Sequence, residues 1–497
     1  MAREPYLALK KSFKRIGALR EAQAILHWDM AVMMPSGSAG GRTEQISELN
    51  LVVHEILNSS EFEDLLIASE SDPPEAPWDR ANLAEMRRLQ VRATALTSDL
   101  VSTLTRSAAE CEMSWREARP ASDFSMVASK LDLLLSLIRE KASALGSVLD
   151  CTPYEALMDE FEPSSKVEVF DRLFDQLLTF LPALLDKALS QQEKRGRLTE
   201  PEGPFPIEAQ KILAEKLMRS LGFDFSRGRL DVSLHPFCGG VPDDIRITTR
   251  YSENNFFESL MGVLHETGHA LYESHLPTEW RSQPVGQARG MALHESQSLL
   301  VEMQLCRSEQ FLNFLVPLIR ESFPEMGYRF DGKTLKALYH KVRPDFIRVD
   351  ADEITYPFHV ILRYRLEKSL LSGDLSISDL PNAWNEGMEE LLGITPSNDR
   401  LGCLQDIHWF SGSFGYFPTY TLGALAAAQI FQAINKAIPD LGSKIASGNF
   451  TEITKWCAKN IHGRASSSTT EKILQDATGQ GLGTEAFRLH LESRYLA

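Results

Sequence analysis

Apolar side chains recur at helical spacing through most of this chain. Five long segments place Leu, Ile or Phe at positions i, i+3 and i+4, with few Gly or Pro residues between them. This spacing predicts amphipathic α-helices. The segments cover residues 5–28, 43–58, 79–112, 123–148 and 165–196.

Clusters of Pro, Gly and Ser interrupt the helical pattern at residues 34–41, 71–74 and 199–204. Such clusters mark turns and loops. The last cluster is the best predicted boundary, because it separates a helical N-terminal region, residues 1–204, from a second region, residues 205–497, which contains the segment His265–His269. We expect the two regions to form one continuous fold rather than independent domains.

The pattern changes after this boundary to alternating apolar and polar positions with β-branched residues. Residues 229–234 and 245–251 are predicted as two short strands, and residues 237–243 as the connection between them. A third strand is expected at 346–350. Helical spacing resumes at residue 256 and continues to the C-terminus, so the sequence predicts a mainly α fold with one small sheet.

Composition narrows the class of protein. The 497 residues are 43% hydrophobic and carry a formal net charge of −16, so we expect a large globular core and no binding to nucleic acid. The longest apolar run, near 422–431, is shorter than the ~18 residues of a membrane span. Six scattered cysteines without a C-x-x-C pair, and a start without a secretory signal, indicate a cytoplasmic location.

One segment carries a recognisable chemical motif. His265-Glu266-Thr-Gly-His269 has the form H-E-x-x-H within a helical pattern. Positions i and i+4 of a helix share a face, so His265 and His269 can bind one metal ion, and Glu266 can reach a water bound to it. Gly268 lowers helix propensity by about 1 kcal/mol relative to Ala, which indicates close packing against this helix.

A zinc site needs a third protein ligand. Glu295 falls 26 residues after His269 within a second helical pattern. This arrangement resembles that of zinc peptidases whose third ligand is a downstream Glu, so Glu295 is the predicted ligand. His294 is the competing candidate, but the two side chains point about 100° apart on a helix, so one of them faces the metal. Glu302 lies two turns further along and could also face the site, although a solvated or salt-bridged carboxylate is the simpler interpretation.

Five short motifs in this order resemble the thermostable carboxypeptidase 1, or carboxypeptidase Taq, family of metallocarboxypeptidases. They resemble the D-x-R-x-T, H-E-x-x-H, H-E-S-Q, I-R-x-x-A-D and G-x-x-Q-D-x-H-W motifs of that family. In this chain they are Asp244–Thr248, His265–His269, His294–Gln297, Ile347–Asp352 and Gly402–Trp409. The likeness extends to His27-Trp-Asp29 and Met34-Pro35, where Val32 replaces the expected Thr.

This resemblance implies a large helical metallopeptidase fold with a deep active-site groove and a small β-sheet next to the zinc helix. It implies a metallocarboxypeptidase that releases single C-terminal residues from peptides with broad specificity. It also implies a homodimer and one divalent metal ion per chain, Zn²⁺ first, with Co²⁺ or Mn²⁺ tolerated. Peptides with a free C-terminus are the expected partners, and no membrane is expected.

The resemblance also indicates which arginines bind substrate. An arginine fork suits a terminal carboxylate because it makes two charge-assisted bonds. Arg348 is the expected anchor, and Arg246 is expected near the site. Alternatives remain open: Arg348 could pair with Asp350 or Asp352, and Arg246 could belong to a structural network within its strand.

Neutral donors are expected to face the oxyanion that forms when a peptide carbonyl is attacked. The stretch after residue 408 looks distantly like the one that supplies a His and a Tyr in peptidases resembling angiotensin-converting enzyme. His408 and Tyr416 are the favoured donors, and Tyr420 is the alternative. Gln405 and Asp406 are expected to orient His408 or a metal-binding histidine.

Two rival functions are weighed against a carboxypeptidase. The first is a metallo-oligopeptidase that cuts internally or releases dipeptides. The second is a helical peptide-binding scaffold that holds a metal without chemistry. Glu266 argues against the scaffold, because a binding module needs no general base at that position.

Overall fold

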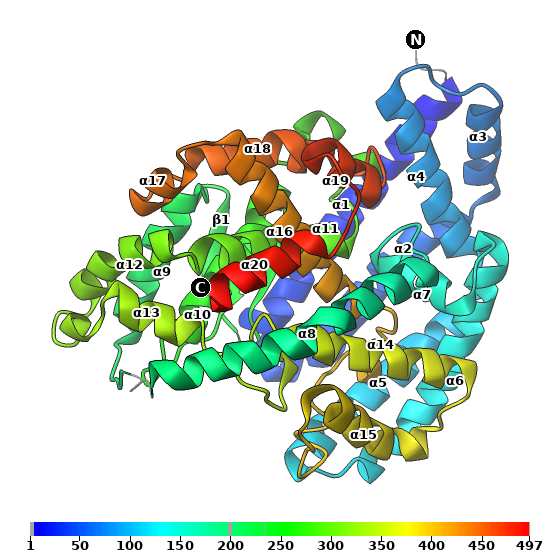
Figure 1. Ribbon diagram of the computed structural model, residues 1–497. Coiled ribbons are helices and arrows are strands. Elements are labelled where there is room, and N and C mark those ends of the chain that lie inside the picture. The colour runs from blue at the N-terminus through cyan, green and yellow to red at the C-terminus, as the bar shows by residue number, and fades with distance from the viewer. Residues whose placement is uncertain (1–3, 197–200, 234, 497) are drawn as a thin grey trace.

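The computed structural model describes residues 4–196, 201–233 and 235–496. This part of the chain contains helices α1–α20 and one three-stranded sheet (Figure 1). The predicted mainly α fold with a small sheet is therefore confirmed, whereas the deep groove stays a prediction.

The first four helices form a unit with its own hydrophobic core. Tyr6, Leu9 and Phe13 of α1 pack there with Val53 and Leu57 of α2 and with side chains of α3 and α4. Figure 1 shows α3 and α4 at one end of the molecule, next to the N-terminus, whereas α1 runs from there towards its middle. Their bounds are α1 Glu4–Val32, α2 Ala39–Asn58, α3 Ser60–Ser71 and α4 Pro77–Thr94.

The segment predicted as one helix over 79–112 is divided between α4 and α5. The Thr97 side chain accepts the backbone N–H of Leu100 and caps a new helix. An N-cap of this kind starts a helix without disturbing the apolar spacing, so the periodicity alone did not reveal the break. The next helices are α5 Ser98–Ala121, α6 Ser125–Leu149, α7 Pro153–Phe161 and α8 Val167–Arg195.

The sheet has the strand order β1-β3-β2. Strand β1 (Gly228–Val232) pairs in parallel with β3 (Asp244–Thr249), and β2 (Phe237–Val241) pairs antiparallel with β3. Most of the predicted connection over 237–243 is therefore itself a strand. Helix α9 (Ile207–Leu221) precedes the sheet.

The predicted third strand over 346–350 is wrong. Residues Arg348–Asp350 form a single 3₁₀ turn. The backbone N–H of Arg348 donates to Gln405 Oε1 at 2.8 Å, so a side chain takes the place of a neighbouring strand. A short alternating pattern cannot show whether such a neighbour exists.

Helix α10 (Phe257–Ser274) packs against β2 and β3, so the sheet lies next to the motif helix as expected. Helix α11 (Met291–Leu299) continues into a π-helix over Leu300–Cys306. The remaining helices are α12 Glu309–Ser322, α13 Gly332–Tyr339, α14 Tyr356–Ser372, α15 Leu380–Leu392, α16 Pro418–Ala437, α17 Leu441–Ala446, α18 Thr451–Asn460, α19 Thr470–Thr478 and α20 Glu485–Tyr495.

Two large hydrophobic cores meet along α11 and α16. Leu422 and Leu425 of α16 belong to the first core, and Ala427 and Ile430 belong to the second. Helix α16 is therefore buried on both faces, which explains the long apolar run in its sequence. Within the described ranges, no helix has both the length and the apolar character that crossing a bilayer requires.

The first large core draws on helices from both sides of residue 204, including α5–α8 and α14–α16. Residues 199 and 200 of the predicted boundary lie outside the described residues. The division into regions 1–204 and 205–497 stays a prediction.

Candidate metal centre and active site

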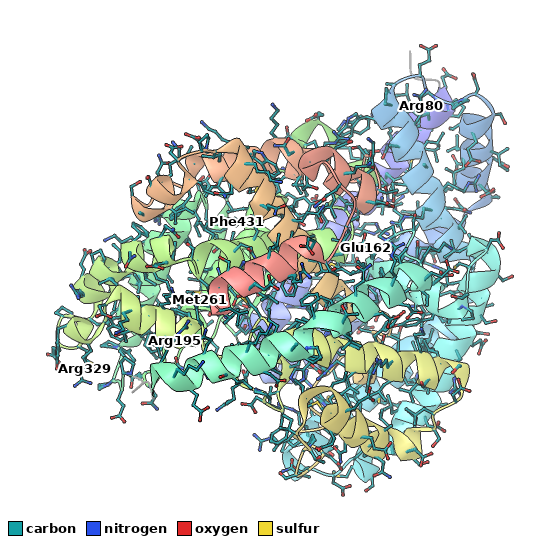
Figure 2. All side chains as sticks on the ribbon, in the orientation of Figure 1. Arg80, Glu162, Arg195, Met261, Arg329 and Phe431 are labelled. Atoms are coloured by element: carbon teal, nitrogen blue, oxygen red, sulfur yellow. The ribbon has the colours of Figure 1, made fainter. Side chains whose placement is uncertain are left out.

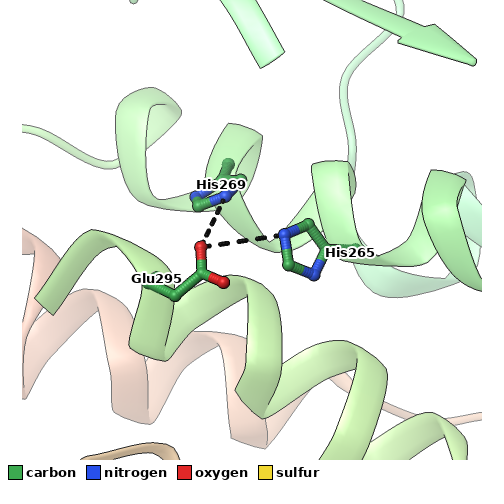
Figure 3. A group of neighbouring side chains, drawn as sticks. All are labelled: His265, His269 and Glu295. Atoms are coloured by element: carbon green, nitrogen blue, oxygen red, sulfur yellow. Dashed lines mark ion pairs between the residues drawn. The ribbon is translucent and has the colours of Figure 1, made fainter. Parts of the chain in front are cut away.

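Two histidines of α10 and one glutamate of α11 converge on one point (Figure 3). The Nε2 atoms of His265 and His269 lie 3.8 and 3.4 Å from Oε2 of Glu295. One ligand atom from each residue lies within 4.8 Å of the other two. This geometry brings together the three residues that the sequence predicts as metal ligands.

Glycines let the helices that carry these ligands approach closely. A Cβ atom on Gly268 of α10 would lie 2.3 Å from the carbonyl oxygen of Gln297 in α11. A Cβ atom on Gly423 of α16 would lie 2.7 Å from Cβ and Cγ of Glu295. The close packing predicted at Gly268 is present, and α16 presses on Glu295 from its other side.

Glu302 orients His265. Its Oε2 atom lies 2.9 Å from His265 Nδ1, and its Oε1 atom accepts Arg307 Nη2 at 2.6 Å. When Nε2 of His265 binds a metal, its Nδ1–H group would donate to this carboxylate. The sequence placed Glu302 two turns after Glu295 but did not establish this role.

His294 contacts Nδ1 of His269, as Glu302 contacts Nδ1 of His265. The Nδ1 atoms of His294 and His269 lie 2.6 Å apart, and His294 Nε2 lies 2.8 Å from Glu273 Oε1. If His294 donates its Nε2–H to Glu273, its Nδ1 accepts the Nδ1–H of His269. His265 and His269 would then each present a bare Nε2 atom to a metal, and His294 lies where it can orient His269.

The electrostatics of the centre favour a cation. Burial alone would lower the pKa of His265, but the charge of Glu295, the bond to Glu302 and the charge of Glu266 raise it to about 10. The carboxylates around His265 therefore stabilise positive charge there, whereas burial and the neighbouring histidines lower the pKa of His269 to about 4. Two imidazoles and one carboxylate are a common zinc ligand set, so the residues present fit a divalent metal.

Glu266 is buried, with 8% of its surface exposed. Burial raises the pKa of its carboxyl group to about 7, with an opposing effect from His265. A carboxyl group with a pKa near neutrality can both accept and donate a proton at neutral pH.

Glu162, which follows α7, caps the helix that carries Glu295 (labelled in Figure 2). Its carboxylate accepts the backbone N–H of Ala292 at 2.9 Å and the hydroxyl of Thr470. A Cβ atom on Gly290 would lie 2.2 Å from Oε2 of this carboxylate, so a larger residue there would displace the Glu162 side chain. A carboxylate at a helix N-terminus stabilises the helix start. The sequence contains no signal for this long-range cap.

Arg348 belongs to a buried cluster of two arginines and one aspartate. Its Nε and Nη2 atoms donate to Asp406 Oδ1 at 3.1 and 2.8 Å, and its Nη1 donates to the hydroxyl of Tyr356 at 2.7 Å. Arg363 donates to Asp406 Oδ2 at 2.7 Å and to Gln405 Oε1 at 2.8 Å. The partner of Arg348 is therefore Asp406. Gln405 and Asp406 hold the arginines rather than a histidine.

Three tyrosines lie within electrostatic range of both the arginine cluster and Glu295 of the metal centre. Burial raises the pKa values of Tyr356, Tyr416 and Tyr420 above their usual range. The charges of Arg348 and Glu295 act in opposite directions on each of the three hydroxyls. The hydroxyls are therefore neutral donors within electrostatic range of both groups.

His408 lies against the same tyrosines. Its Nε2 atom is 3.1 Å from the Tyr420 hydroxyl, and its ring centroid is 5.4 Å from that of Tyr416. Burial lowers the pKa of His408 to about 4, so its imidazole is neutral near pH 7. The structure thus brings together all three predicted oxyanion donors.

Arg246 in β3 pairs with Asp244, with Nη2 and Oδ2 2.7 Å apart. Its guanidinium lies 4.2 Å from the centre of the Trp28 ring of α1. These contacts match the structural network that the sequence left open, and a role in substrate binding stays a prediction.

Comparisons with known proteins agree with this geometry. A family model described as carboxypeptidase Taq (M32) metallopeptidase matches residues 8–495. Thermostable carboxypeptidase 1 of Thermus thermophilus is 36% identical over 485 residues, which are 95% of each chain. Thermostable carboxypeptidase 1 of Pyrococcus furiosus is 34% identical over 494 residues, which are 97% of each chain.

A solved structure shows the same fold. Trypanosoma cruzi metallocarboxypeptidase 1 has a TM-score of 0.97 at 38% identity, and the match covers 99% of this chain and 100% of that one. The family expected from the five motifs is therefore confirmed over nearly the whole chain. This chain belongs to the carboxypeptidase Taq (M32) family and is a metallocarboxypeptidase.

Proposed function

We propose that this enzyme releases single amino acids from free peptide C-termini with broad specificity. The observation that carries the proposal is the charge around Arg348. Arg348 and Arg363 share one carboxylate, Asp406, so the cluster retains a net positive charge.

Arg348 has donors left for a ligand. A guanidinium has five N–H groups. Among the described residues, three of those of Arg348 donate to Asp406 and Tyr356, so one N–H remains on each terminal nitrogen. A substrate carboxylate would accept these two bonds and neutralise the charge, with its last peptide bond directed towards the metal centre.

Glu266 is the proposed general base. A divalent metal held by His265, His269 and Glu295 would acidify a water molecule and polarise the carbonyl of the peptide bond. Glu266 removes the proton from the attacking water and later donates a proton to the leaving amine. Its pKa of about 7 suits both steps near neutral pH.

Neutral donors stabilise the oxyanion in this proposal. If His408 donates its Nε2–H to the oxygen of Tyr420, the Tyr420 hydroxyl proton is free to point at the oxyanion. Tyr416 supplies a second hydroxyl close by, with ring centroids 5.2 Å apart. Donors placed before the reaction stabilise the developing charge without reorganisation.

The metal and the oligomeric state are proposed from the family resemblance. We propose Zn²⁺ as the metal, with Co²⁺ or Mn²⁺ as substitutes, and a homodimer as the assembly. A cytoplasmic location is also proposed, because all six cysteines are free thiols.

The direct test compares one peptide as its free acid and as its C-terminal amide. Loss of one partner of a desolvated charge pair costs about 2–5 kcal/mol. Because each 1.4 kcal/mol corresponds to a factor of ten, kcat/KM for the amide should be roughly 30- to 4,000-fold lower than for the acid. Mass spectrometry should show the acid shortened one residue at a time, whether or not its N-terminus is acetylated.

Variants assign this selectivity to one residue. Arg348→Ala should slow cleavage of the acid and bring the acid-to-amide ratio towards one. Arg343→Ala is the matched control, because Arg343 is exposed and pairs with Asp345. Equal cleavage of acid and amide by the wild-type enzyme would refute the proposal and favour a metallo-oligopeptidase.

A further inference from the structure

The last helix of the chain is tied to the metal centre through the π-helix. Arg494 of α20 is buried, with 7% of its side chain exposed. Its Nη1 donates to the carbonyl oxygen of Met303 at 2.5 Å, and its Nη2 donates to that of Gln304 at 3.4 Å. These two residues directly follow Glu302, which holds His265.

Arg494 contacts the π-helix close to its C-terminal end. The backbone N–H groups of Arg307 and Ser308 both donate to the carbonyl of Leu305. The carbonyls of Met303 and Gln304, in the last turn of the π-helix, accept the side-chain donors of Arg494. A cationic side chain suits this place, since the final carbonyls of a helix carry partial negative charge.

Glu353 fixes the guanidinium of Arg494 from the other side. Its carboxylate accepts Arg494 Nη1 at 2.7 Å, His490 Nε2 at 2.8 Å and the Tyr495 hydroxyl at 2.9 Å. Burial would raise the pKa of Glu353, but Arg494 and His490 hold it well below its usual range. Glu353 closely follows Arg348 in sequence, so α20 contacts both the π-helix and the segment that carries the proposed substrate anchor.

Glu302 transmits this restraint to the metal ligand. It lies within the π-helix, bonds His265 Nδ1 at 2.9 Å and is held by Arg307 at 2.6 Å. A shift of the Met303 and Gln304 carbonyls would move Glu302, and with it the direction in which His265 presents Nε2.

We propose that Arg494 is a positioning residue for the metal centre, acting through the π-helix and Glu302. Residues that orient a metal-ligating histidine typically affect metal affinity by about 10- to 100-fold. The proposal rests on the proposed function only in requiring that His265 binds the metal. It assigns the C-terminal helix a part in metal retention.

The test measures the affinity of the full-length protein for Zn²⁺ by competition with a chelator. Arg494→Ala should weaken Zn²⁺ binding by about 10- to 100-fold. Arg494→Lys keeps a cation that can reach one carbonyl, so it should give an intermediate affinity. Arg488→Ala is the matched control, because Arg488 lies on the same helix, is 42% exposed and pairs with Glu485; its affinity should equal that of wild type.

A double variant separates positioning from general stability. If Arg494 acts through Glu302, adding Arg494→Ala to Glu302→Ala should weaken Zn²⁺ binding by less than about twofold further. A purely structural role predicts a lower unfolding temperature of the metal-free protein with unchanged Zn²⁺ affinity. That result, or losses that multiply in the double variant, would overturn the proposal.

A milder variant keeps the test decisive if Arg494→Ala does not fold. Tyr495→Phe removes one hydrogen bond from Glu353 and should weaken Zn²⁺ binding by up to about fivefold. Unchanged affinity in both Tyr495→Phe and Arg494→Lys would overturn the proposal. A wild-type protein that binds Zn²⁺ but cleaves no peptide would refute the proposed function and leave this inference standing.

Discussion

Gly268→Ala tests whether close contact between α10 and α11 builds the metal centre. The added methyl group would lie 2.3 Å from the carbonyl oxygen of Gln297 and 2.6 Å from Cα of Ser298. Both atoms belong to the backbone, so neither can rotate away. Nonbonded heavy atoms normally lie about 3.5 Å apart, so the two helices must separate by roughly 1 Å.

The effect on stability should be modest. Overpacking of this kind destabilises a protein by about 1–3 kcal/mol. The higher helix propensity of Ala than of Gly stabilises it by about 1 kcal/mol. The net loss in the free energy of unfolding of the metal-free protein is therefore between about 0 and 2 kcal/mol.

The effect on the metal centre should be larger. His269 lies on α10 and Glu295 on α11, so their separation follows the separation of the helices. Metal–ligand distances tolerate only about 0.2 Å, and a misplacement of 1 Å typically costs about 10²-fold in rate. We expect kcat/KM to fall by about 10²-fold, together with the bound metal content.

The assay measures kcat/KM on a free-acid peptide, metal content after gel filtration, and thermal unfolding. Gly262→Ala is the matched control, because Gly262 lies on the same helix and a Cβ atom there would meet nothing within 4 Å. That variant should keep full activity and gain about 1 kcal/mol in stability. A Gly268→Ala protein with normal metal content and activity would refute the reasoning.

Two further changes address the ligands and the base directly. His265→Ala should remove metal and activity together, because two remaining protein ligands hold zinc poorly; a full metal equivalent with normal turnover would contradict the assignment. Glu266→Gln should keep the metal content near wild type while kcat falls by a factor on the order of 10²–10⁴, and a near-normal kcat would remove Glu266 from the mechanism.

Local chemistry was accessible from the sequence. The i, i+4 spacing of His265 and His269 depends only on helix geometry, and the structure has both Nε2 atoms facing one point. The argument that only one of His294 and Glu295 can face the metal likewise needs only one helix, whereas the choice of Glu295 came from its likeness to zinc peptidases with a downstream Glu ligand. Apolar spacing predicted most helices for the same reason, since the residues that form one buried face of a helix lie close together in the sequence.

Only the tertiary structure revealed the hydrogen bonds and ion pairs between residues that lie far apart in the sequence. Nothing in the sequence near Arg348 indicates that its partner is Asp406, or that Glu162 caps the helix that carries Glu295. Any buried carboxylate could satisfy an arginine or a helix start, so sequence alone cannot choose among them. The false strand at 346–350 has the same origin, because a strand exists only where another backbone pairs with it. Packing selects these partners, and packing is a property of the whole chain.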